Sequence, residues 1–361
     1  MPITAAAICR ASLLLFVPLS LALHHLRLAP PLWIFLSGLV AIGVLGDWMR
    51  RGTEQLSGHA GSAIGSLLNV SFGNAAELVL GLFVLSQAQT RVVQAQITGS
   101  IIGTTLLFLG IAVLVGGVRR ERQSFSKAHV GLLSTLLLLL TVAILLPAIF
   151  NATERLTSPG ADLSQLDERL SLCVSAVLLL LYAAHLIYVL VTHRTMFAGS
   201  SEQRTAPEWS LPRGLAVMIG AAIGIGFESE LLSSRLAETA SDLGLSPVFM
   251  GVVALALIGT VADLFAAVAF ARADKMDIVL GLCIGSAIQI ALVVAPLLVL
   301  TSWAIGHPMS LVFGSPLDLF AIASATFIVR AIVEDGETTW YEGILLIGVY
   351  ALFASAYYLQ R

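Results

Sequence analysis

The sequence has few charged residues. Of its 361 residues, 11% are Asp, Glu, Lys or Arg, whereas 58% are hydrophobic and the mean hydropathy is +0.94. An ordinary soluble domain carries about 25% charged residues, so this chain lacks the polar side chains that a water-facing surface needs. The low charge therefore excludes a soluble globular protein.

Other features are also scarce. The three cysteines, Cys9, Cys173 and Cys283, all lie in apolar runs, which argues against a disulfide framework. The net charge of −3 gives no sign of nucleic-acid binding. No low-complexity tract is present, and the longest polar connection, from His193 to Pro212, is too short to fold alone. The chain is therefore predicted to have no separate soluble domain.

What the sequence does have is a series of long apolar runs. A run of about 20 residues is long enough to cross a bilayer as a helix, and the continuous apolar character excludes the alternating strands of a membrane barrel. We predict an all-α polytopic membrane protein with about 11 transmembrane helices. The expected spans are 5–26, 30–49, 55–87, 92–118, 128–150, 168–192, 214–241, 247–271, 276–304, 310–333 and 339–359. The first lacks a clear small-x-small cleavage site, which favours a retained helix over a signal peptide.

The basic residues predict the orientation of these spans. Cytoplasmic loops carry an excess of Lys and Arg. With the N-terminus inside, most of the 19 basic residues fall on the cytoplasmic side. The exceptions are Arg27, Arg91, Arg155, Arg169, Arg235 and Arg361. This bias predicts an N-terminus inside and a C-terminus outside.

An internal repeat appears when the chain is shifted by 186 residues. Gly73-Asn-Ala-Ala-Glu77 then falls on Gly259-Thr-Val-Ala-Asp263, and Gly99-Ser100 falls on Gly285-Ser286 without a gap. The two motifs lie five spans apart, an odd number, so the equivalent helices are predicted to run antiparallel. Inverted repeats of this kind are typical of secondary transporters, whose substrate site lies near the bilayer midplane between the repeats.

The repeat divides the chain into four predicted parts. An extra N-terminal transmembrane helix occupies 1–29, and a first five-helix repeat occupies 30–193. A cytoplasmic connecting loop follows at 194–212, and the second, inverted five-helix repeat occupies 213–361.

Each motif contains one isolated carboxylate. Glu77 is the only formal charge between Glu54 and Arg91, and Asp263 is the only one between Asp242 and Arg272. A carboxylate at the bilayer centre costs about 2.5 kcal/mol or more, so such residues are usually functional or paired. Two facing carboxylates suit a hard divalent cation, because Ca²⁺ takes roughly six to eight oxygen ligands. Protons compete for the same groups, and this competition is the physical basis of antiport.

Residues around the two acids fit this interpretation. Side-chain oxygens that can add ligands are those of Asn74, Thr260, Ser100, Ser286 and Gln289. The glycines at 73 and 259 allow a helix break or a close helix approach, and the Gly-Ser pairs at Gly99 and Gly285 are more often packing devices than ligands. Glu54 and Glu230 lie nearer helix ends and are either solvated or part of an ion pathway.

Three stretches resemble a known family. Residues 52–117, which contain "GNAAE", resemble the first repeat of the calcium/proton exchangers, the cation-exchanger branch of the calcium/cation antiporter superfamily. Residues 227–300 resemble the second repeat, and the tail "EDGETTWYEGILLIGVYALFA" also fits. The resemblance implies one plus five plus five helices and the exchange of Ca²⁺ for protons. It also implies that Glu77 and Asp263 bind the ion, with Glu54 and Glu230 on a flanking pathway.

The chain departs from the family pattern at several positions. The second family motif usually reads Gly-Asn-Ala-Ala-Glu-His, whereas this chain has Thr260, Asp263 and Leu264 at the Asn, Glu and His positions. Thr104 stands where the family commonly has Asn. Two amide ligands are thus replaced by hydroxyls, and the second acid is one methylene shorter. We expect weaker Ca²⁺ affinity or a different preferred cation.

The sequence therefore predicts a Ca²⁺/H⁺ antiporter in a prokaryotic cytoplasmic membrane, without a cofactor and with Ca²⁺ as the transported substrate. The closest alternative keeps the fold and exchanges Na⁺ or K⁺ for protons, or couples Ca²⁺ to Na⁺. A third possibility is a non-transporting sensor or scaffold. An intramembrane enzyme is disfavoured, because the sequence contains no His-Glu-x-x-His or Gly-x-Ser-x-Gly motif.

Overall fold

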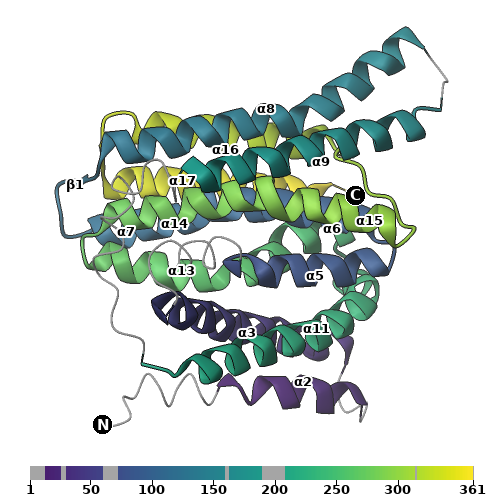
Figure 1. Ribbon diagram of the computed structural model, residues 1–361, viewed down its shortest axis with the longest axis horizontal. Coiled ribbons are helices and arrows are strands. Elements are labelled where there is room, and N and C mark those ends of the chain that lie inside the picture. The colour runs from purple at the N-terminus through teal and green to yellow at the C-terminus, as the bar shows by residue number, and fades with distance from the viewer. Residues whose placement is uncertain are drawn as a thin grey trace.

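A computed structural model shows a helical bundle in which most helices lie side by side along one direction (Figure 1). The structure describes residues 13–25, 30–59, 72–158, 162–188, 208–313 and 315–360. Within these residues, nine helices are long and apolar enough to cross a membrane by length and composition. The expectation of an all-α membrane fold is therefore confirmed.

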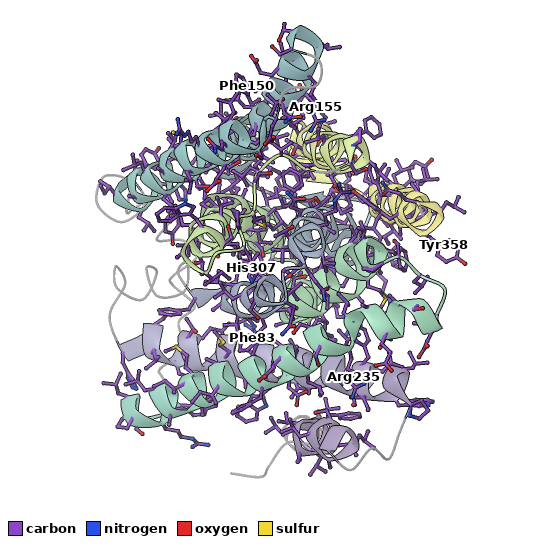
Figure 2. The ribbon with its side chains drawn as sticks, turned by 90° about the vertical axis from the view of Figure 1, so that its right-hand side faces the viewer. Phe83, Phe150, Arg155, Arg235, His307 and Tyr358 are labelled. Carbon is purple, nitrogen blue, oxygen red and sulfur yellow. The ribbon has the colours of Figure 1, made fainter. Side chains whose placement is uncertain are left out.

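The helices of the first half begin with α2 and α3 and end with α9. Their bounds are α2 Phe16–His25, α3 Pro31–His59, α5 Ala75–Ser86, α6 Thr90–Ile102, η1 Gly103–Phe108, α7 Leu109–Gly117, α8 Lys127–Thr157 and α9 Ser164–Ile187. A two-residue strand, β1, spans Gln123–Ser124. Phe150 and Arg155 mark the end of α8 that projects beyond the bundle (Figure 2).

The second half begins with α11. Its elements are α11 Leu211–Asp242, α12 Pro247–Phe249, η3 Met250–Leu255, α13 Ala256–Arg272, α14 Met276–Gln289, η4 Ile290–Val294, α15 Ala295–Ala304, α16 Pro316–Val333 and α17 Trp340–Leu359. The strand β2, Glu337–Thr338, pairs antiparallel with β1. The segments labelled η are π-helical turns that continue directly into α-helix.

Two predicted boundaries differ from the structure. The span expected at 30–49 continues as α3 to His59, so the charged residues after Trp48 are helical and do not form a loop. They remain helical because Asp47 pairs with both Arg50 and Arg51, and Arg50 also pairs with Glu54, at helical spacings of three or four residues. The span expected at 55–87 therefore begins inside α3, and the motif helix α5 begins only at Ala75.

Several other boundaries agree within two residues, and some predictions fall outside the described residues. The structure has helices at 90–117, 247–272 and 276–304, close to the expected 92–118, 247–271 and 276–304, whereas the helix expected at 128–150 continues to Thr157. Residues 5–12 and 26 of the predicted first helix and 194–207 of the predicted connecting loop lie outside the described part.

The helices α3 and α11 form a tightly packed antiparallel pair. A methyl group at Gly52 would lie 3.2 Å from the Gly214 carbonyl oxygen, and one at Gly38 would lie 3.4 Å from the Leu232 side chain. Small residues at these crossings allow the two backbones to approach closely. At one end of the pair Trp48 stacks on Trp209 with 5.9 Å between ring centroids, and the Arg213 guanidinium lies 5.2 Å from the Trp209 ring.

The motif helices α5 and α13 lie between this pair and the remaining helices (Figure 1). Buried Leu45 of α3, Ala76 of α5 and Ile225 of α11 form one apolar cluster. Phe83 of α5 also faces the pair, because a methyl group at Gly226 of α11 would lie 3.4 Å from its ring (Figure 2). The α3–α11 pair thus covers the helices that carry the two acids.

Two of the described π-helical segments, η1 and η4, occupy matching places in the two halves. A shift of 186 residues places η1, Gly103–Phe108, on residues 289–294, which contain η4, Ile290–Val294. The π-helical turn is rare, and it is frequent at functional sites. Each segment directly follows the helix that carries one of the two Gly-Ser pairs.

A polar strap joins the two halves at one end of the bundle. In addition to the β1–β2 pairing, Arg122 forms an ion pair of 2.7 Å with Glu337. Arg120 donates hydrogen bonds to the carbonyl oxygens of Gly116 and Ala271, at 2.6 and 3.3 Å, near the ends of α7 and α13. Its guanidinium thus binds carbonyl groups in the last turns of two helices, where intrahelical donors run out.

Candidate functional site

The two motif carboxylates are buried next to each other. Glu77 lies in the first turn of α5 and is 2% exposed, and Asp263 lies on α13 and is 8% exposed. Each lies in a largely apolar stretch of helix, and Glu77 packs against Gly259, one helical turn before Asp263 on α13. Two like charges at this depth are costly unless a cation or protons neutralise them.

Gly259 is the residue that lets Glu77 approach α13. A methyl group at this position would lie 3.0 Å from Cγ of Glu77, which is tighter than an ordinary contact. The expectation of close packing at Gly259 therefore agrees with the structure. Gly73, at the equivalent position in the first motif, is exposed and lies in the turn before α5. The motif helix thus starts beside its acid in the first half, whereas α13 continues unbroken past Asp263.

An amide-hydroxyl network links the first motif to the second half of the chain. Asn74 donates from Nδ2 to Oε1 of Gln289 at 3.1 Å and to the carbonyl oxygen of Ser286 at 3.4 Å. Its Oδ1 accepts a hydrogen bond of 3.0 Å from the Ser286 hydroxyl. The structure thus brings three of the predicted residues together, and Ser286 and Gln289 connect the first motif to α14.

The two threonines that replace family amides bond to their own helices. Thr260 donates to the carbonyl oxygen of Ala256 at 2.8 Å, and Thr104 donates to that of Ser100 at 2.8 Å. Both side chains are almost fully buried. Each hydroxyl has a single proton, so neither has one left to donate across the helix interface.

Several buried oxygen atoms on α5 and α6 have no hydrogen-bond partner within the described residues. They include Oε2 of Glu77 itself and Oγ of Ser100. Gln96 on α6 donates to the Glu77 carbonyl oxygen at 3.2 Å, and its Oε1 is also unpartnered. A buried acceptor without a partner is unfavourable, and a cation or a proton at Glu77 satisfies the carboxylate. Gln96 was not predicted; a Gln inside an otherwise apolar span was the only signal.

Neutral amide, hydroxyl and carbonyl oxygens matter for cation binding because few charged ligands are available. No group of three or more His, Cys, Asp or Glu residues gathers anywhere in the described ranges. Two carboxylates supplemented by amide, hydroxyl and carbonyl oxygens form a donor set of the kind that hard cations prefer over soft ones.

The remaining predicted residues lie farther out. Glu54 on α3 is 48% exposed at its side chain and pairs with Arg50. Glu230 on α11 is exposed. Gly99 is packed so closely that a methyl group would lie 2.1 Å from the Val252 carbonyl oxygen, whereas one at Gly285 would meet nothing within 4 Å. The structure thus gives a packing role to Gly99 and none to Gly285.

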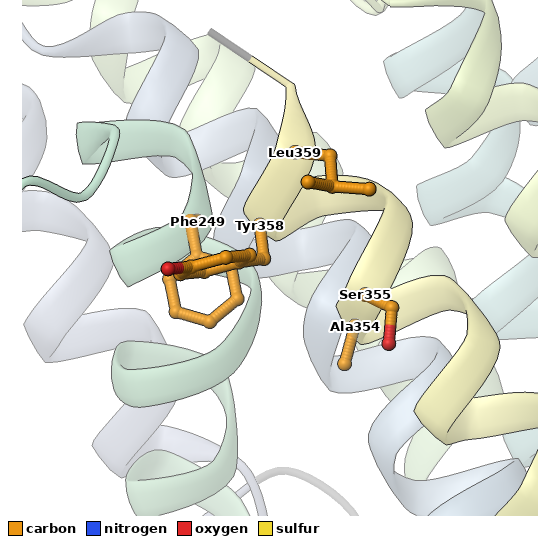
Figure 3. Close-up of a pocket in the computed structure, with 5 residues that line it drawn as sticks. All are labelled: Phe249, Ala354, Ser355, Tyr358 and Leu359. Atoms are coloured by element: carbon orange, nitrogen blue, oxygen red, sulfur yellow. The ribbon is translucent and has the colours of Figure 1, made fainter.

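A shallow surface pocket elsewhere contains none of the predicted site residues. It lies between α12 and the end of α17 and is lined by Phe249, Ala354, Ser355, Tyr358 and Leu359 (Figure 3). The Phe249 and Tyr358 rings pack edge to face at 5.8 Å.

Nine long apolar helices within the described residues define the class of the molecule as a multi-pass membrane protein. Comparison with known proteins gives the family. The model of the family described as "Sodium/calcium exchanger protein" matches residues 30–191 and 213–359. The chain belongs to this family.

Similar proteins cover nearly the whole chain. A Ca(2+)/H(+) antiporter of Synechocystis sp. is 38% identical over 363 residues, 96% of this chain and 96% of that protein. The Ca(2+)/H(+) antiporter ChaA of Bacillus subtilis is 37% identical and covers 95% of this chain and 96% of its own length.

Solved structures agree with this assignment. The structure of native YfkE matches with a TM-score of 0.82 and 32% identity, over 97% of this chain and 99% of that one. The H⁺/Ca²⁺ exchanger CAX matches with a TM-score of 0.71 at 15% identity, over 98% of this chain and 92% of that one. At that identity, the second match supports the fold alone.

Proposed function

We propose that this chain is a secondary transporter that exchanges Ca²⁺ for protons, with the ion bound between Glu77 and Asp263. The observation that carries the proposal is the burial of these two carboxylates where α5 packs on α13, beside the hydrogen-bonded oxygens of Asn74 and Ser286. Relatives described as Ca(2+)/H(+) antiporters, at 37 and 38% identity over nearly their full length, support both ions. The relatives are transporters, so we assign transport and no enzymatic reaction to this chain.

The charge of the site provides the coupling. Two ionised carboxylates carry a charge of −2, and one Ca²⁺ or two protons cancel it. An empty, doubly charged site is costly inside the membrane, whereas either loaded form is electrically neutral. Crossing is therefore favoured only when the site is loaded, and the two kinds of cargo replace each other. Asn74, Ser286 and Gln289 complete the ligand set around Ca²⁺, with Ser100, Thr104 and Thr260 as further oxygens.

Alternating access requires the cover over the site to move. The α3–α11 pair packs over α5 and α13 through apolar side chains, among them Leu45, Ala76 and Ile225. We propose that displacement of this pair relative to the motif helices opens the site to one side at a time, with Glu54 and Glu230 on the ion pathway.

The proposed topology has eleven helices, a cytoplasmic N-terminus and two inverted repeats of five, in the cytoplasmic membrane of a prokaryote. The matching positions of η1 and η4 and the two separate family matches support the repeats. The β1–β2 pairing supports the orientation, because it joins two connections that the basic residues place on the same side. In a variant whose three native cysteines have been replaced, Arg122→Cys is expected to react with an impermeant thiol reagent only from the cytoplasm. Gly306→Cys is expected to react only from outside.

A cation panel tests the transport proposal. Purified protein in liposomes with a pH-sensitive dye is expected to move protons when Ca²⁺ is added, and not when Na⁺ or K⁺ is added. Glu77→Gln is expected to abolish this flux while inserting normally. Glu154→Gln, a carboxylate on the projecting end of α8, serves as the matched control and retains the flux.

Other outcomes favour other functions. Proton flux with Na⁺ or K⁺ alone supports monovalent cation exchange. The shorter side chain of Asp263 is the feature that motivates this alternative. Ca²⁺ uptake that requires Na⁺ and moves no protons supports Na⁺ coupling. Wild-type Ca²⁺/H⁺ exchange in Glu77→Gln contradicts the assigned site.

A further inference from the structure

A third buried carboxyl group lies outside the site and has no part in the proposed exchange. Glu228 on α11 is 0% exposed, although Glu230, two residues later on the same helix, is exposed. It faces the N-terminal helix α2 and the early part of α3. Ser20 of α2 lies 2.5 Å from its Oε1, and a methyl group at Gly38 of α3 would lie 3.4 Å from its Oε2.

The hydrogen bonds of Ser20 require one more proton than serine supplies. Its Oγ lies 2.8 Å from the carbonyl oxygen of Val17 and 2.5 Å from Oε1 of Glu228. A carbonyl oxygen only accepts, and an ionised carboxylate also only accepts. Because the hydroxyl has a single proton, an ionised Glu228 would leave one of these two short contacts between two acceptors, which is repulsive. A protonated Glu228 supplies the missing proton.

The alternative of a bound cation fits poorly. Within the described residues Glu228 forms no ion pair, and its Oε2 is buried without a hydrogen-bond partner. One carboxyl and one hydroxyl fall far short of the roughly six to eight oxygens that Ca²⁺ takes. The neutral acid avoids the cost of an unpaired buried charge, and its remaining oxygen is a weaker acceptor that loses less by having no partner.

We propose that Glu228 is a proton-binding residue separate from the Glu77 and Asp263 pair, and that it holds its proton in the conformation seen here. Glu228 donates from Oε1 to Oγ of Ser20, and Ser20 donates to the Val17 carbonyl oxygen. This chain of two hydrogen bonds fastens α2 to α11, which packs along α3 (Figure 1). The proton stays in place during exchange, so Glu228 is a positioning residue for α2 and not an ion ligand.

Infrared difference spectroscopy of the protein in lipid bilayers tests the protonation directly and does not depend on transport. The wild-type minus Glu228→Gln spectrum at neutral pH is expected to contain the carbonyl-stretch band of a protonated carboxylic acid. Ser20→Ala is expected to shift this band, because the acid loses its acceptor. Ser37→Ala is the matched control: this buried serine of α3 makes the same bond to a carbonyl three residues earlier, at 2.9 Å, and has no carboxyl partner among the described residues. It should leave the band unchanged.

A carboxylate band in place of the acid band would overturn the proposal. Transport and thermal unfolding of the same variants provide the second test. Glu228→Gln, which is neutral and equally long, is expected to keep Ca²⁺/H⁺ exchange and the wild-type unfolding temperature. Glu228→Asp, which cannot reach Ser20, is expected to lower the unfolding temperature. Loss of exchange in a folded Glu228→Gln would show that ionisation of Glu228 is needed and would also overturn the proposal.

Discussion

The two halves of the site differ at one matching pair of contacts. Asn74 of the first half bonds to Ser286 of the second, with the amide donating and accepting. The equivalent pair by the 186-residue shift is Thr260 and Ser100. There the threonine bonds only to its own helix, and the serine hydroxyl is buried without a partner within the described residues.

The difference shows what an amide supplies that a hydroxyl does not. Asn74 has two donor protons and an acceptor oxygen at the end of a longer side chain, so it spans the helix interface. Thr260 has one proton, which it donates to the Ala256 carbonyl oxygen at 2.8 Å. Thr260 therefore makes no side-chain hydrogen bond to the first half within the described residues, and the acid of the second motif is one methylene shorter. We infer that the first motif fixes the ligand geometry.

The largest expected effect comes from Gly259, whose counterpart Gly73 is exposed. Gly259→Val is expected to displace Glu77, because even the first added carbon would lie 3.0 Å from Cγ of Glu77. Misplacement by about 1 Å can cost on the order of a hundredfold in rate. Initial rates of Ca²⁺-driven proton flux measure this effect. Gly348→Ala on α17, where an added methyl group meets nothing within 4 Å, is the control. Near-normal flux in Gly259→Val would contradict the contact.

The second prediction makes the first half resemble the second. Asn74→Thr removes three hydrogen bonds to Ser286 and Gln289. At about 1 kcal/mol for each bond, partly compensated by water, Ca²⁺ affinity is expected to fall by roughly tenfold or more. The Ca²⁺ concentration that gives half-maximal flux is the measurement. An unchanged value would mean that the amide network does not shape the ion site.

The third prediction lengthens the shorter acid. Asp263→Glu is expected to raise Ca²⁺ affinity, on the order of fivefold or about 1 kcal/mol, because the carboxylate reaches the ion without an intervening water. The same flux titration serves. An unchanged or weaker affinity would show that the shorter side chain is not a defect of reach.

The smallest expected effect is on stability. Thr260→Asn is expected to bond with the unpartnered Ser100 hydroxyl and to raise the free energy of unfolding by about 1 kcal/mol. A double-mutant cycle with Ser100→Ala, read by thermal unfolding, isolates this bond. A coupling energy near zero would contradict the predicted contact across the helix interface.

Much of this architecture could be predicted because apolar runs and their spacing determine it. The expected spans 247–271 and 276–304 agree with helices at 247–272 and 276–304. The boundary at residue 49 was wrong because Arg50 and Arg51 were interpreted as a loop. Their ion pairs with Asp47, at helical spacing, let α3 continue to His59. Counting the charged residues in a stretch does not show which of them pair along a helix.

The site was predictable only in part, for a different reason. The two acids stand out in the sequence because each is alone in an apolar run. The direction in which a side chain faces cannot be read from the sequence in this way. Glu228 and Glu230 are two residues apart and so point to different sides of α11; the sequence indicated Glu230, whereas Glu228 is the buried one. The Gly-Ser pairs looked equivalent, yet only Gly99 packs against another backbone. Such assignments depend on how each helix is rotated, which the neighbouring helices determine.

The stacking of Trp48 on Trp209 gives the protein an intrinsic optical reporter. Of its five tryptophans, Trp33, Trp303 and Trp340 are exposed at the surface of the bundle, whereas these two lie face to face beneath Arg213. Stacked indoles emit differently from separated ones. Trp48 lies on α3 and Trp209 lies just before α11, so the stack forms where these two parts of the chain meet. Tryptophan fluorescence recorded during Ca²⁺ loading therefore reports, without any attached dye, whether this helix pair stays joined as a single unit.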